Sequence, residues 1–127
     1  EKEWEIMKKH VIYGKEIIQK AGEKSSGKNL FLNAAINIAY THHEKWDGSG
    51  YPQGLKEDEI PIEGRLMAIA DVYDALTSKR VYKEKFNYEK AENMIINESG
   101  THFDPILIKA FIDLKSEFRK IAQKYED

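Results

Sequence analysis

Two adjacent histidines, His42 and His43, stand near the start of the segment THHEKWDGSGYPQG, in a chain that has only four histidines. Imidazole nitrogens bind transition metals and transfer protons near neutral pH. Neighbouring residues of an α-helix point about 100° apart, so one ion is poorly served by both rings unless the helix ends there. Two ions about 3.5–4 Å apart would suit them, with one imidazole for each ion. The alternative is that His42 is a buried structural residue and His43 a surface one.

Asp71 is the second candidate, because it lies in the apolar segment LMAIADVYDALTS. We expect its carboxylate to be buried, and burial is costly unless the group is paired or binds a metal. The competing interpretation is a salt bridge or another satisfied buried carboxylate. His10 adds an imidazole beside the apolar stripe of an earlier helix. Nitrogen and carboxylate ligands together suit iron, manganese or zinc.

Two further segments have residue types that suit a phosphate ligand. In DGSGYP the glycines free the backbone to approach a ligand, Tyr51 offers a ring or a hydroxyl, and Pro52 fixes the turn. The segment TSKRVYKEKF carries four cations, and an arginine can grip a phosphate through two parallel hydrogen bonds. The alternatives are an ordinary surface turn and a solvated charged face. His102, in GTHFDP, is expected to fix a turn and is not counted as a ligand.

Helical periodicity positions these residues and predicts an all-α chain of about five helices without strands. The first helix carries an apolar stripe from Trp4 to Ile18, and a polar break follows at residues 21–29. A second helix begins near Phe31 and ends near His43. The histidine pair is therefore expected at a helix end.

The second half of the chain has clear signals for helix starts. Residues 45–60 are predicted to be loop, and Pro61 to lie in the first turn of a third helix. Asn87 is expected to cap a fourth helix, which stops near Gly100. Asp104-Pro105 is expected to begin a fifth helix. The predicted inner face of that helix consists of Leu107, Phe111, Leu114, Phe118 and Ile121.

The composition is typical of a folded globular domain. The 127 residues fit one domain, with 41% hydrophobic and 33% charged residues. A net charge of −2 gives no general attraction to a nucleic acid polymer or to an anionic membrane. No apolar run approaches the roughly 20 residues of a membrane span. The absence of cysteine excludes disulfides and zinc–thiolate sites, and suits the cytoplasm.

The segments HHEKWDGSGYP, IADVYDALTSKRVYK and GTHFDP, in this order, resemble the motifs of the HD-GYP domain. This is the branch of the HD superfamily that hydrolyses cyclic di-GMP with metal ions. The opening EWEIMKKH also fits, so the resemblance extends from residue 3 to residue 112. It implies a helical bundle with two or three divalent ions as cofactors, iron or manganese. It also implies bacterial second-messenger signalling, in which cyclic di-GMP is opened to linear pGpG and further to GMP.

The resemblance also implies roles for individual residues. The implied metal ligands are His10, His42, His43 and Asp71, and the two adjacent imidazoles would serve different ions of one cluster. The implied substrate-binding residues are Gly50, Tyr51 and Pro52 of the GYP loop, together with Arg80 and Lys83. Docking of diguanylate cyclase domains through the GYP loop is a further implied interaction.

The sequence departs from the family pattern, because it contains no His-Asp dipeptide. We therefore expect residues 1–127 to be a single domain, the C-terminal portion of an HD-GYP domain. The catalytic His-Asp pair and a lysine would lie upstream, and none of these catalytic residues would be in this chain. We expect weak metal binding, little turnover, and self-association through uncovered apolar surface. Two alternatives stay open: a non-catalytic module that binds nucleotide or a partner protein through the GYP loop, and an HD phosphohydrolase with another substrate.

Overall fold

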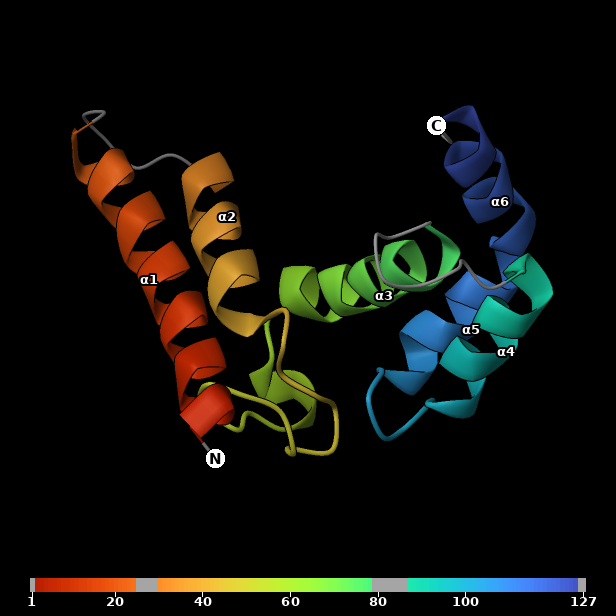
Figure 1. Cartoon of the computed structure of the whole chain (residues 1–127), viewed down its shortest axis with the longest axis horizontal. Helices are drawn as coiled ribbons and strands as arrows, with labels where there is room; N and C mark the ends of the chain where they lie inside the picture. Colours follow the sequence, from red (N-terminus) through yellow and green to blue (C-terminus); the bar gives the residue numbers. More distant parts are fainter. Residues whose placement is uncertain (1, 25–29, 79–86, 126–127) are drawn as a thin grey trace.

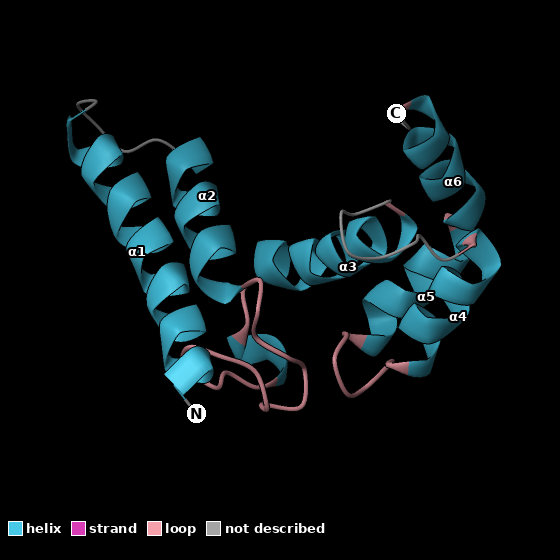
Figure 2. Ribbon diagram, viewed as in Figure 1, coloured by secondary structure: helices cyan, strands magenta, loops and turns pink. Residues whose placement is uncertain are grey.

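The computed structural model describes residues 2–24, 30–78 and 87–125, and these ranges contain six α-helices and one short 3-10 helix (Figure 1). The α-helices are α1 (Lys2–Lys24), α2 (Leu30–Thr41), α3 (Ile62–Thr77), α4 (Tyr88–Asn97), α5 (Pro105–Asp113) and α6 (Lys115–Lys124). The 3-10 helix η1 (Glu57–Glu59) lies between α2 and α3. No strand occurs in the described ranges (Figure 2), so the predicted all-α class is confirmed. None of the helices in these ranges combines the length and hydropathy needed to cross a bilayer.

The helices form two groups joined by α3 (Figure 1). Helices α1 and α2 lie side by side at one end, and α4, α5 and α6 gather at the other. Helix α3 runs between the two groups. The loop that joins α2 to α3 lies beside the N-terminal end of α1. The segment after the histidine pair is therefore close to three helices at once.

The predicted helix starts in the second half are confirmed by their caps. The Asn87 side chain accepts a hydrogen bond from the Lys90 N–H at 2.7 Å, and α4 begins at the next residue. The Asp104 side chain accepts from the Ile106 N–H at 2.9 Å, with Pro105 in the first turn of α5. Each cap satisfies a backbone donor that the helix leaves unpaired. Pro61 lies one residue earlier than predicted, at the N-cap position of α3.

The predicted fifth helix is wrong in one respect, because it is two helices. Leu114 has φ −105° and ψ 10°, so α5 ends before it and α6 begins after it. The break turns part of the expected inner face outward, and Leu114 is 47% exposed and Ile121 59% exposed. Phe111 remains buried and Phe118 packs against the core. A continuous apolar period does not reveal an interruption of a single residue.

The core lies between α3 and the C-terminal helices. Its buried members are Ala68, Ile69, Tyr73, Ile95, Phe103, Ile108 and Phe111. Edge-to-face aromatic contacts join α3 to α5 and α6, with ring centroids 6.0 Å apart for Tyr73 and Phe111 and 5.2 Å apart for Tyr73 and Phe118. These contacts fix the C-terminal part of α3, while its first turns face α2.

Close packing of α2 on α3 depends on Gly64. A Cβ atom added to Gly64 would collide with the hydroxyl of Thr41 and lie 3.0 Å from the Thr41 Cβ. Next to this contact, Asn37 Nδ2 donates to Glu63 Oε1 at 2.6 Å. Glycine therefore lets the end of α2 approach the first turns of α3. This approach determines where the histidines that follow Thr41 lie.

Candidate metal centre

The histidine pair follows the end of α2 directly, as predicted. Helix α2 ends at Thr41, and the rings of His42 and His43 have centroids 4.0 Å apart. Nδ1 of His42 lies 2.7 Å from the carbonyl oxygen of Ile38. A carbonyl oxygen can only accept, so Nδ1 carries the proton and Nε2 is left free to bind a cation. The local backbone thus selects the tautomer that a metal ligand needs.

Helix α3 brings Asp71 to the same place. Asp71 lies seven residues after Gly64, close to two helical turns, so the two residues share the face that meets α2. One ligand atom each from His42, His43 and Asp71 lie within 4.8 Å of one another. Two imidazole nitrogens and a carboxylate oxygen form a donor set that fits iron, manganese or zinc. The structure therefore brings together three of the four predicted ligands.

The surroundings of Asp71 differ from the prediction, because its side chain is exposed and not buried. Ala70 next to it is exposed as well, so α3 is open around Asp71 in the described part of the protein, beyond the point where Gly64 meets Thr41 of α2. His10, the fourth predicted ligand, lies exposed on α1 and does not belong to the group of three. Arg80 and Lys83 lie outside the described residues.

Burial lowers the pKa of His43 below its ordinary value of 6.5, and the neighbouring His42 lowers it further. The Asp71 carboxylate acts in the opposite direction. A lowered pKa keeps the imidazole neutral near pH 7, which is the form that binds a metal. The lowered pKa of His43 and the tautomer of His42 thus both favour a neutral imidazole that can bind a metal.

The GYP loop folds back onto the histidine pair. The N–H of Tyr51 donates to the carbonyl oxygen of His43 at 3.2 Å. At Gly50 an added Cβ atom would lie 2.5 Å from that same oxygen and 2.6 Å from the Glu44 Cα. Only glycine permits this approach. The Tyr51–Pro52 peptide bond is cis.

Tyr51 packs on the candidate centre. Its ring stacks on the His43 ring with centroids 5.0 Å apart and an interplanar angle of 16°. Trp4 of α1 meets Tyr51 edge-on at 4.5 Å. Tyr51 is only 8% exposed, and burial raises the pKa of its hydroxyl, with Asp71 adding to the shift. In this structure Tyr51 therefore supports His43 and is covered by Trp4.

Glu44 has a structural role here that the sequence did not reveal. Its side chain is 1% exposed, and its Oε2 and Oε1 accept hydrogen bonds from the N–H groups of Gln53 and Leu55 at 2.8 and 2.9 Å. Glutamate is rarely buried to this extent. A glutamate between a histidine pair and a glycine-rich loop therefore gives no indication in the sequence that it will be buried. Only the three-dimensional path of the loop shows its role.

A second contact joins the loop to the GTHFDP turn. The N–H groups of Trp46 and Asp47 donate to the carbonyl oxygens of His102 and Thr101 at 3.0 and 2.9 Å. The ring of His102 stacks on Phe103 and does not belong to the group of three candidate ligands. The contact with the loop uses the backbone carbonyl of His102, so a turn-fixing hydrogen bond of its ring stays a prediction.

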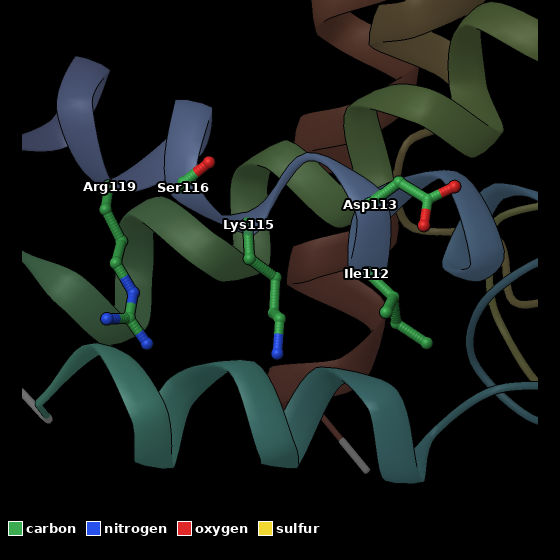
Figure 3. A pocket seen from close by; sticks show the side chains of 5 residues that line it. All are labelled: Ile112, Asp113, Lys115, Ser116 and Arg119. Atoms are coloured by element: carbon green, nitrogen blue, oxygen red, sulfur yellow. The ribbon is translucent and has the colours of Figure 1, made fainter.

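A hollow on α5 and α6 lies apart from this centre. It is lined by Ile112, Asp113, Lys115, Ser116 and Arg119, and the side chains of Lys115 and Arg119 point toward α4 (Figure 3). Arg119 forms two hydrogen bonds with the buried carboxylate of Glu92, at 2.7 and 2.6 Å. None of the predicted site residues lines this hollow, so we assign the candidate function to the histidine pair.

A family model described as "HD domain" matches residues 1–107. This chain belongs to the HD domain family. The chain is 50% identical over 125 residues, or 98% of its length, to a probable cyclic di-GMP phosphodiesterase of Vibrio cholerae serotype O1. It is 42% identical over the same share to a cyclic di-GMP phosphodiesterase of Thermotoga maritima. The predicted resemblance to the HD-GYP branch is thereby confirmed.

Other relatives have a related cyclic dinucleotide in their names. A 3'3'-cGAMP-specific phosphodiesterase 2 of Vibrio cholerae is 45% identical over 98% of the chain. The crystal structure of a cyclic GMP-AMP specific phosphodiesterase of V. cholerae is 27% identical, with a TM-score of 0.57 over 70% of this chain and 20% of that one. The chain spans 28%, 32% and 23% of the length of the three relatives compared by sequence.

Proposed function

We propose that this HD domain takes part in the metal-dependent hydrolysis of cyclic di-GMP to linear pGpG, and further to GMP, in bacterial second-messenger signalling. The observation that carries the proposal is the convergence of ligand atoms of His42, His43 and Asp71 within 4.8 Å. The GYP loop lies beside them, in a close approach that requires glycine at position 50. Relatives named as cyclic di-GMP phosphodiesterases support the substrate class. Bound divalent ions would neutralise the phosphodiester, lower the pKa of the attacking water and stabilise the leaving oxygen.

The protein's own residues would hold and orient the ions and the substrate. His42 offers Nε2 because its Nδ1 proton is held by the Ile38 carbonyl oxygen, and Asp71 supplies negative charge. In the proposal His10 completes the ligand set, and the ions are two or three of iron or manganese. Gly50, Tyr51 and Pro52 border the substrate, and Arg80 and Lys83 bind its phosphates.

The proposal includes the place of this segment in a larger unit. In the proposal, residues 1–127 act as the C-terminal portion of an HD-GYP domain; the missing His-Asp dipeptide and the greater length of the relatives support this. The catalytic pair and its lysine then come from elsewhere in a longer cytoplasmic protein. On its own, we expect the segment to bind metal weakly, to turn over little substrate and to self-associate through apolar side chains. Trp4, Ile6, Met7, Tyr13 and Ile17 are exposed on α1.

Two other functions are supported by specific observations. Hydrolysis of 3'3'-cGAMP is favoured by the relative that is 45% identical and named for that substrate. A non-catalytic module that binds cyclic di-GMP or a diguanylate cyclase domain is supported by the absence of the His-Asp dipeptide and by the hydrogen bonds that tie the GYP loop to Glu44.

The deciding experiment measures turnover of cyclic di-GMP and 3'3'-cGAMP by the parent protein, loaded with iron or manganese. The proposal predicts conversion of cyclic di-GMP to pGpG or GMP, and loss of conversion in His42→Ala and His43→Ala variants. Preferred cleavage of 3'3'-cGAMP would mean that 3'3'-cGAMP, and not cyclic di-GMP, is the substrate. Binding without turnover by a correctly metallated parent would favour the non-catalytic module and overturn the enzymatic proposal.

A further inference from the structure

We propose that Glu44 is a positioning residue for the candidate metal centre: its carboxylate holds the GYP loop in the form in which Tyr51 fixes the ring of His43. The metal-binding consequence rests on the proposed function. The effect on the orientation of His43 does not depend on it.

The first step of the argument is the burial of Glu44. At 1% exposure its carboxylate is removed from water, which is costly unless its oxygens are hydrogen-bonded. Both oxygens are bonded, each to one backbone N–H of the segment that follows Pro52. Hydrogen bonds to an ionised group are shorter and stronger than neutral ones. One side chain thus holds the second half of the loop, residues 53–55, at two points.

The second step is the path from these anchors to the metal-ligand candidate. Residues 53 and 55 are held against Glu44, so the chain between Glu44 and Gln53 must close a tight loop. Closure presses Gly50 against the backbone of His43 and Glu44, and it lets the Tyr51 N–H reach the His43 carbonyl oxygen. The Tyr51 ring then stacks on His43. Releasing the anchor would free the Tyr51 ring, and with it the ring of His43.

The third step is a comparison within the same chain. Glu92 is equally buried, at 1% exposure, but it pairs with Arg119 between α4 and α6. Loss of either carboxylate weakens the fold, but only Glu44 contacts the loop that packs on His43. Glu92→Gln is therefore a matched control for burial, charge and side-chain size.

The experiment compares wild type, Glu44→Gln and Glu92→Gln in two measurements. The first is the NMR signals of the histidine ring protons in the metal-free protein, assigned with His→Ala variants. We expect the His43 signals to shift in Glu44→Gln as the Tyr51 ring current is lost, while those of His10 stay in place. The second is Mn²⁺ affinity by calorimetry. We expect a loss of about 10–100-fold in Glu44→Gln and none in Glu92→Gln, the range usual for residues that orient metal ligands.

A second variant covers the case in which Glu44→Gln does not fold. Gln53→Pro removes one of the two N–H donors without touching the buried carboxylate, and should shift the His43 signals in the same direction by less. Unchanged His43 signals in every folded variant of the loop would overturn the proposal, whatever the loss of thermal stability. If the wild-type parent protein binds no Mn²⁺, the proposed function fails, and the NMR comparison still decides the role of Glu44.

Discussion

Arg65 on α3 and Asp104 at the start of α5 form an ion pair, with 2.7 Å between Nη1 and Oδ2. Asp104 is 3% exposed and also caps α5, while Arg65 Nε donates to the carbonyl oxygen of Ile60 at 2.9 Å. One guanidinium therefore joins the end of the loop after the histidine pair to the C-terminal helices. Because the loop carries the GYP motif, the stability of the candidate centre depends on α5, although α5 supplies none of the predicted ligands.

Replacing Arg65 by methionine should lower the free energy of unfolding by about 3–5 kcal/mol, because it leaves the Asp104 carboxylate buried without its charged partner. Urea denaturation followed by circular dichroism measures this loss. Lys120→Met is the control. Its ion pair with Glu117 spans 3.5 Å between side chains that are 72% and 58% exposed, so we expect no measurable change. Equal stabilities of Arg65→Met and wild type would contradict the structural role of the ion pair.

Replacing Asp71 by asparagine should weaken Mn²⁺ binding at least about tenfold while leaving the melting temperature of the metal-free protein nearly unchanged. The reason is that the Asp71 carboxylate is exposed and is one of the three converging groups. Calorimetric titration and thermal unfolding give the two values. Asp74→Asn, an exposed carboxylate on the same helix, should leave the Mn²⁺ affinity as it is. An equal loss of affinity in both variants would point to general charge and not to a ligand.

Replacing Gly50 by alanine should cost about 1–3 kcal/mol of stability, because the added Cβ atom overlaps the backbone of residues 43–45. The same change at Gly14 should instead stabilise the protein by about 0.5–1 kcal/mol. Gly14 lies inside α1, and an added Cβ atom there would meet nothing within 4 Å apart from its chain neighbours and the helix's own backbone. Denaturant midpoints of the two variants test the contrast. A neutral Gly50→Ala would mean that the loop can move away from His43 without cost.

The pH dependence of stability should contain a contribution from His102. Burial lowers the pKa of His102 below 6.5, and the positive charges of Lys45 and His43 add to this, while Glu98 and Asp47 oppose it. The unfolded chain therefore binds the proton more readily than the folded one. The contribution is fully present above the unfolded pKa and is lost as the pH falls through the folded pKa.

Unfolding free energies at about pH 7.5 and about pH 5.5 test this contribution, since the two values bracket the ordinary pKa of histidine. Wild type should lose more stability on acidification than His102→Asn, which keeps the backbone hydrogen bonds but cannot titrate. The comparison removes the parallel effect of His43, which is present in both proteins. Identical pH profiles would show that His102 titrates alike in the folded and unfolded states.

Several features were predictable because their signals are local. Asn87 and Asp104-Pro105 mark helix starts by the chemistry of a cap, and α2 ends where the pattern of apolar residues gives way to the histidine pair. The break at Leu114 was not predictable, because the apolar period continues across it. Local signals thus locate the ends of most helices, but not an interruption inside a periodic stretch.

The candidate site was predictable in its residue types and less so in its geometry. The histidine pair and Asp71 were recognised from the kind of side chain and from the family resemblance. Their convergence depends on Gly64, which in the sequence is an ordinary glycine near a helix start. The exposure of Asp71 and the burial of Glu44 depend on which elements cover them, and no pattern of neighbouring residues encodes that.

The contact between Gly64 and Thr41 also limits which changes of length the chain can accept. The contact fixes one point of α3 against α2, and Asp71 lies about 10 Å further along the helix axis. One residue inserted between Gly64 and Asp71 would rotate the carboxylate by about 100° and carry it away from both imidazoles. The seven-residue interval therefore fixes both the distance and the direction of Asp71 relative to the contact with α2. We expect related proteins to have no insertions or deletions between Gly64 and Asp71. Changes of length should occur instead in segments that do not lie between residues of the candidate site.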